Sequence, residues 1–235
     1  YEPSHDIISY SQDFICLLLR HFALEKKYEH SHHLESLAKR VFLGASNEKI
    51  YAFTEAIFLC AKPNYYAFEL HKLLRIVINE NLTLVLNLLS SEEGKINNDV
   101  DRALYFTLNC DPLEESELNV DEVLEWGDNV AGTRFSAIAK LLVPYSKTEG
   151  VYTWTKLSQS MRLRSNDVEA LLKEMVNNFR PQVTSRGWSA QMEEHSVLLV
   201  ELLSSERADI SIAARQLLEK FDRSIIQEKE RESSD

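Results

Sequence analysis

The sequence predicts an all-α protein, and three observations support that prediction. Apolar residues recur at three- and four-residue spacing along most of the 235-residue chain, as a buried helical face requires. Only 6 residues are Gly and 5 are Pro, well below the usual frequencies of roughly 7% and 5%, and folds built from strands need more turn residues than this. The polar breaks are short, so successive helices are expected to pack as antiparallel neighbours.

The first helices are placed by their apolar faces and by the residues that end them. Along residues 7–22, the side chains that we expect to be buried are Ile7, Ile8, Phe14, Ile15, Leu18, Leu19 and Phe22. A second helix ends near Gly44, which accepts a positive φ. A third ends before Pro63, and Asn81 marks a break after the fourth. The helices expected here are 6–24, 34–42, 47–62, 64–80 and 82–89.

An acidic segment follows at residues 92–128. It holds 2 Lys or Arg against 12 Asp or Glu, a net charge of −10, whereas residues 1–91 carry −1. Pro112 interrupts its helical spacing, and so many charges are costly to bury. We therefore expect an exposed, mobile connecting segment between two helical halves, residues 1–91 and 129–235.

The C-terminal half continues the helical pattern with two interruptions. Gly150 and the β-branched Val151 and Thr153 indicate a short irregular link, and residues 181–189 a longer one. The residues after Ile226 have no apolar face and are expected to fray. The helices expected here are 133–143, 155–161, 166–179, 190–203 and 209–232.

A unit of two helices recurs about every 35–45 residues, which is the range of helical-repeat proteins. Such units cannot each bury their own apolar face, so they are expected to stack on a shared core as a right-handed α-solenoid. A closed helical bundle fits the same periodicities and remains an alternative.

The sequence holds no pattern typical of catalysis or of a bound cofactor. It has no phosphate-binding glycine loop, no dinucleotide fingerprint and no nucleophile elbow. Its acidic residues do not form a calcium loop, and His30, His32 and His33 do not have the spacing of a zinc module. We therefore expect no catalytic residue, no cofactor and no metal site. An enzyme whose site is assembled from residues dispersed along the chain remains a second alternative to the leading function.

The cellular context is inferred from the cysteines and from the absence of long apolar runs. The cysteines are few and widely separated, as expected of free thiols in a reducing cytoplasm; they are Cys16, Cys60 and Cys110. No run approaches the ~18 apolar residues of a membrane span, and no signal peptide opens the chain. Residue 1 is Tyr, and we expect a segment of a longer protein.

Residues 129–190 carry a net charge of +5 in an otherwise acidic chain. Within them, residues 152–188 have the outline of a winged helix-turn-helix, whose arginines would contact phosphates. Asp167, Glu169 and Glu174 on the second helix oppose nucleic-acid binding, which remains the alternative function. Arg and Trp are enriched at protein-binding hot spots. The expected partner-binding residues are Trp154, Arg162, Arg164, Arg180, Arg186 and Trp188, unless both tryptophans belong to the core.

Residues 130–232 also resemble a known family. The features, in order, are a W-T-x-L-S helix, a helix that ends in F-R-P, a Trp-Ser turn, an L-L-x-x-L-L helix and a final A-R-x-x-L helix. The residues that carry them are Trp154, Leu157, Leu171, Phe179, Arg180, Pro181, Trp188, Ser189, Leu198, Leu199, Leu202, Leu203, Ala214 and Arg215. This order resembles the HEAT-like helical C-terminal regions of large multidomain bacterial proteins, including STAND-type NTPases of anti-phage systems.

The resemblance implies a HEAT-like scaffold or sensor module and brings no catalytic residues with it. Together with the helical pattern, it favours a non-catalytic helical-repeat interaction module of a larger bacterial protein. Such a module would bind a protein partner or an adjoining domain of the same chain, without a membrane.

Overall fold

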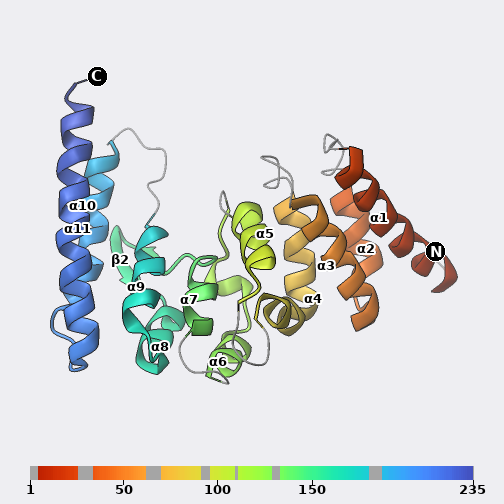
Figure 1. Cartoon of the computed structure of the whole chain (residues 1–235), viewed down its shortest axis with the longest axis horizontal. Helices are drawn as coiled ribbons and strands as arrows, with labels where there is room; N and C mark the ends of the chain where they lie inside the picture. The colour runs from red at the N-terminus through yellow and green to blue at the C-terminus, as the bar shows by residue number, and fades with distance from the viewer. Residues whose placement is uncertain are drawn as a thin grey trace. The chain divides into compact units, whose positions relative to one another are not determined.

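The computed structural model of the chain describes residues 5–25, 34–61, 70–90, 96–108, 111–128, 133–179 and 187–234. These residues are mostly helical, and the sheet they form is a two-stranded hairpin (Figure 1). The predicted helical class is therefore confirmed. The chain divides into two compact units, Tyr1–Trp126 and Gly127–Asp235.

The described residues of the first unit form five α-helices, a short 3-10 turn and most of a sixth helix, α6, which ends two residues beyond Trp126. The core of this unit includes Phe42 and Phe53, whose rings stack with centroids 4.0 Å apart. Helix α1 packs against α2 and α3, while α4 packs against α2, α3 and α5, and α3 also contacts α5. The elements are α1 (His5–Glu25), α2 (Leu34–Phe42), α3 (Asn47–Ala61), α4 (His71–Leu89), α5 (Asn98–Leu108), η3 (Glu115–Glu117) and α6 (Val120–Asp128).

Helix α1 has two apolar faces, and only one of them is buried. Ile15 and Leu19 are fully buried, as predicted. Ile7 and Phe14, predicted on the same buried face, are instead more than half exposed. The prediction was wrong for these two residues because apolar spacing marks a face but does not show whether a neighbour covers it.

The break predicted at Asn81 is present as a kink inside α4. Asn81 has φ −158° and ψ 80°, which are not helical angles, and helical structure resumes directly after it. The predicted start of this helix at Asn64 lies outside the described residues.

The acidic segment differs from the exposed connector expected at residues 92–128. Its part up to Trp126 belongs to the first unit, and α5 packs on α3 and α4. Val100, Leu104 and Val123 are buried, so the apolar spacing outweighs the charge. The acidic residues described in this segment are exposed or half-buried, and Arg75 of α4 forms ion pairs with two of their carboxylates. It pairs with Glu117 at 2.6 Å and Asp111 at 3.3 Å. Whether the segment is mobile remains a prediction.

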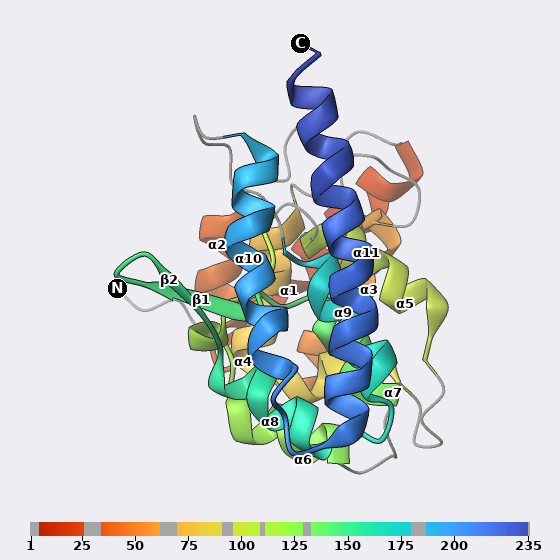
Figure 2. The same ribbon diagram turned by 90° about the vertical axis from the view of Figure 1, so that its left-hand side faces the viewer.

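The second unit holds five helices and the hairpin. Helix α10 packs along α11 and against β2, while α9 contacts α7, α8 and α11. Figures 1 and 2 both show α10 and α11 side by side. The elements are α7 (Thr133–Ala139), β1 (Tyr145–Thr148), β2 (Val151–Trp154), α8 (Lys156–Arg164), α9 (Val168–Asn177), α10 (Trp188–Leu202) and α11 (Ala208–Glu232).

The irregular link predicted around residue 150 is an antiparallel hairpin. Tyr145 pairs with Trp154, and Thr148 with Val151. The two turn residues, Glu149 and Gly150, have positive φ values of 52° and 86°, as a tight two-residue hairpin turn requires. The prediction failed because Glu149 is not a residue that usually signals such a turn.

The C-terminal residues do not fray as expected but continue α11 to Glu232. The Glu232 carboxylate accepts hydrogen bonds from the main-chain N of Trp188 (2.5 Å) and Ser189 (3.1 Å), and from the Ser189 hydroxyl (2.5 Å). These groups form the first turn of α10, whose free N–H groups need acceptors. The end of α11 is therefore anchored by polar contacts that an apolar pattern does not reveal.

Candidate functional site

A groove lies between α3 and α4 in the first unit. It consists of two adjoining pockets of about 300 and 260 Å³, which share Tyr51 and Leu88. One wall is a stripe of α3 at four-residue intervals, namely Asn47, Tyr51, Glu55 and Leu59. The other wall comes from α4 after its kink, and Asn97, Asp99 and Val100 line the far end. We call this surface the α3–α4 groove.

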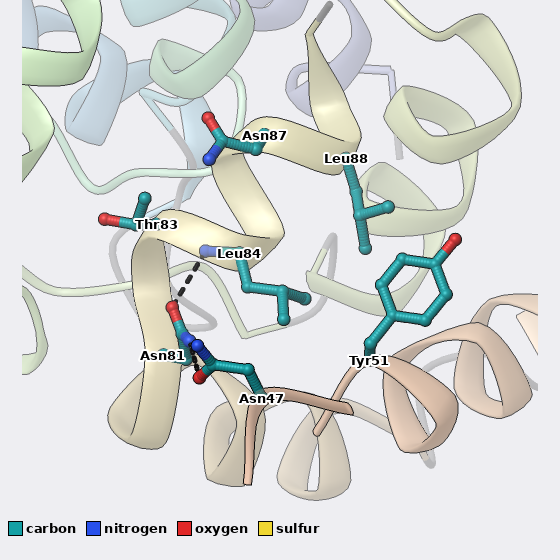
Figure 3. A pocket seen from close by; sticks show the side chains of 7 residues that line it. All are labelled: Asn47, Tyr51, Asn81, Thr83, Leu84, Asn87 and Leu88. Carbon is teal, nitrogen blue, oxygen red and sulfur yellow. Dashed lines mark hydrogen bonds between the residues drawn. The ribbon is translucent and has the colours of Figure 1, made fainter. Parts of the chain in front are cut away.

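The kink at Asn81 shapes this groove. The Asn81 side chain donates from Nδ2 to Asn47 Oδ1 (2.8 Å) and accepts at Oδ1 from the main-chain N of Leu84 (2.9 Å), as Figure 3 shows. The second bond is a helix cap, because it satisfies an N–H group at the start of the resumed helix. Asn81 therefore both starts the second segment of α4 and ties it to α3.

Two carboxylates brace the kink from either side. Glu122 of α6 accepts from the main-chain N of Thr83 at 2.7 Å and from the Thr83 hydroxyl. Glu80 accepts from the main-chain N of Gly44 at 2.8 Å. Since Glu122 of α6 holds the backbone after Asn81, and the Glu80 side chain before it is tied to the Gly44 backbone, we infer that the groove is preformed.

The groove combines apolar, amide and acidic groups. Tyr51 and Leu59 are 42% and 44% exposed, and Asn87 is exposed with no hydrogen-bond partner among the described residues. A hydrogen bond to the Glu55 carboxylate raises the pKa of Tyr51. Glu55 lies 4.0 Å from Arg20, a weak ion pair that leaves its side chain 46% exposed. The free amide suits a peptide backbone, and the carboxylates suit a cation.

Trp154 and Arg162, two of the residues expected to bind a partner, are buried in the second unit. Trp154 is 3% exposed and donates from Nε1 to Leu198 O at 2.9 Å. The Arg162 guanidinium lies 4.5 Å from the centre of the Trp154 ring. Arg162 is 6% exposed, and burial lowers its pKa to about 10. Both side chains belong to the core, contrary to the expected accessible face.

The remaining expected residues do not form one face in the described part of the chain. Arg164 is half exposed and pairs with Asp128 at 2.5 Å. Trp188 is 49% exposed at the start of α10. Arg180 and Arg186 lie outside the described residues, as does the His30, His32 and His33 cluster.

The helix-turn-helix outline is present as α8 and α9, joined by residues 165–167. However, Asp167 caps α9 by accepting from the main-chain N of Ala170 at 3.1 Å. With Glu169 and Asp209 it lines a pocket of about 310 Å³ at the starts of α9 and α11. Three carboxylates at this position repel phosphate, so this surface does not favour nucleic-acid binding.

The second unit also contains a buried histidine. His195 of α10 is 1% exposed, and neither ring nitrogen has a hydrogen-bond partner among the residues that the structure describes. Its ring centroid lies 4.4 Å from Tyr152, 4.6 Å from Tyr145 and 5.4 Å from Phe179. Burial lowers the His195 pKa to about 4, so the imidazole is neutral at pH 7.

Sequence reasoning missed the α3–α4 groove. The stripe at positions 47, 51, 55 and 59 is visible in the sequence, because four-residue spacing places side chains on one helical face. The facing wall is not visible, since it depends on how α4 resumes after Asn81.

Comparison of the chain with protein-family models, curated proteins and solved structures finds no match. Among the described residues, no cluster of three or more His, Cys, Asp or Glu side chains is placed to hold a metal ion. None of the helices in the described ranges is long and apolar enough to cross a membrane.

Proposed function

We propose that this chain is a non-catalytic helical-repeat interaction module whose α3–α4 groove binds an extended peptide segment of a protein partner. The segment carries basic and apolar side chains, and it belongs either to a separate protein or to an adjoining domain of a longer chain. The observation that carries this proposal is the preformed groove, with its unpaired amide and exposed apolar side chains.

The helix contacts of the first unit support a stacked, HEAT-like arrangement. Each of α1, α2 and α3 packs against the helix two places further along the chain, as well as against a sequence neighbour. In helical-repeat proteins, each helix is expected to pack against the equivalent helix of the next repeat, which is two helices further along the chain. This arrangement places side chains of successive helices in a row, which suits an elongated ligand. A scaffold or sensor role is also what the resemblance of residues 130–232 implies.

The chemistry of the groove supports a basic, partly apolar peptide. Tyr51, Leu59 and Leu88 supply apolar contact area, and Asn87 can hydrogen-bond to a peptide group. Glu55 lines the second pocket, where it can pair with a Lys or Arg. The first unit holds 11 Lys or Arg against 21 Asp or Glu, a net charge of −10, and this field attracts cationic segments.

Selection of a random peptide library displayed on phage against the immobilised chain tests the proposal. Enriched peptides are expected to carry Lys or Arg beside apolar residues. Tyr51→Ala and Leu88→Asp should each weaken their binding about tenfold or more. Tyr105→Ala is the matched control, because Tyr105 is 41% exposed and lines neither pocket. Peptides that bind all four proteins equally would contradict the proposal.

A further inference from the structure

Helix α1 exposes a second apolar stripe on the face opposite its buried residues. The stripe consists of Ile7, Tyr10, Phe14, Leu17 and Leu24, whose exposed fractions range from 57% to 81%. The spacing alternates between three and four residues, and His21 occupies the remaining position. We call this surface the outer stripe.

The outer stripe has the pattern of a helix that packs against another helix. Alternating spacings of three and four residues keep apolar side chains on one line along the helix, as in a coiled-coil seam. Contiguous exposed apolar patches of this kind mark interaction surfaces. Within the described residues, α1 packs mainly against α2 and α3, through residues such as Ile15 and Leu19 on its other face.

We propose that the outer stripe pairs with the same stripe of a second copy of this chain, with the two α1 helices antiparallel about a two-fold axis. A two-fold axis makes each contact occur twice. If the axis passes between Phe14 and Leu17, Phe14 lies against Leu17 of the second copy. Ile7 then lies against Leu24 of the second copy.

Charges beside the stripe favour a copy of the same helix as the occupant. Asp13 and Arg20 flank the outer stripe on the same side, at positions where charged residues set the partner and orientation of paired helices. In the antiparallel arrangement, each Asp13 faces Arg20 of the second copy. In a parallel arrangement Asp13 would face Leu18 instead, so the charges select the antiparallel pair.

Both charged side chains remain accessible for this contact. Asp13 is 63% exposed although it pairs with Lys49 at 2.5 Å, and Arg20 is 50% exposed beside Glu55 at 4.0 Å. The pairs across the two-fold axis therefore add to the pairs within each copy. This inference is independent of the peptide-binding proposal, because it rests on α1 and not on the α3–α4 groove.

Sedimentation equilibrium of the 235-residue chain tests the pairing. The chain is expected to dimerise, and Phe14→Glu combined with Leu17→Glu should raise the dimer dissociation constant at least about tenfold. Leu43→Glu is the control, because Leu43 is 75% exposed and lies outside α1. Circular dichroism should show the same helix content in all variants, since each substituted side chain is more than half exposed.

Charge reversal then tests the orientation. Asp13→Arg and Arg20→Asp are each expected to weaken the dimer, and the double variant to restore it. A chain that stays monomeric up to about 100 µM would overturn the proposal, and so would a dimer indifferent to Phe14 and Leu17. In either case the stripe would belong to another protein or to another helix of a longer chain.

Discussion

Replacing His195 by Phe is expected to make the second unit less sensitive to acid. His195 lies among Tyr145, Tyr152 and Phe179, and within the described part of the chain neither of its nitrogens has a hydrogen-bond partner. A phenyl ring of similar size therefore removes no hydrogen bond. Burial is the main cause of the lowered His195 pKa; the charge of Glu194 of α10 raises the pKa, and that of Lys147 of β1 lowers it.

The magnitude follows from the difference between the pKa in the folded and the unfolded chain. Burial lowers the His195 pKa from 6.5 to about 4. Each pKa unit corresponds to about 1.4 kcal/mol, so charging His195 in the folded state costs about 3 kcal/mol. The unfolded chain binds the proton first, so stability falls as the pH drops from about 6.5 to about 4. Above that range His195 has no effect on the pH dependence.

Urea unfolding at pH 7 and at pH 4, followed by tryptophan fluorescence, measures this effect. The wild-type chain should lose about 3 kcal/mol more unfolding free energy on acidification than His195→Phe does. Val197→Ala is the control, because Val197 is 58% exposed on the same helix, α10, and has no titratable group, so its loss on acidification should match that of the wild type. If wild type and His195→Phe lose equal amounts of unfolding free energy on acidification, His195 is not a cause of the acid sensitivity.

Three further predictions, tested by four substitutions, concern other contacts. Arg162→Met should leave the unfolding free energy unchanged or raise it by up to about 2 kcal/mol, because two buried guanidinium nitrogens have no partner; a loss of similar size in urea unfolding would contradict this. Gly127→Ala should cost about 1–3 kcal/mol, since its Cβ would lie 2.0 Å from the Phe135 ring. Adding Phe135→Leu to Gly127→Ala should restore part of the lost unfolding free energy. If it does not, the clash with Phe135 is not the cause of the loss. Glu232→Ala should speed hydrogen exchange at the Trp188 amide, and an unchanged rate would show that this cap does not protect α10.

Most helices could be predicted from the sequence, because apolar spacing and helix-ending residues are local signals. The end of α2 near Gly44 and the break at Asn81 each follow from one residue and its backbone preferences. The hairpin could not be predicted in this way. Its two-residue turn requires a positive φ at Glu149, a conformation that Glu rarely adopts.

The candidate site was less predictable than the fold. Trp154 and Arg162 have the composition of a binding surface, but β2 and α8 carry both side chains into the core. Tyr51 and Leu88 are unremarkable in sequence and meet only because α4 resumes beside α3. Residue type therefore indicates what a surface would bind, whereas packing decides whether a surface exists.

The helical class, most helix boundaries and the acidic charge of the first unit follow from the amino-acid sequence alone. Apolar spacing and composition express these properties whichever helices pack together. The covering of apolar faces depends on the folded chain, as the buried Ile15 and the exposed Phe14 of one helix show. The same holds for the contacts in which Glu232 caps α10 and Glu122 braces the kink of α4. These contacts join residues about 40 positions apart, and whether such a pair meets depends on the packing of every helix between them.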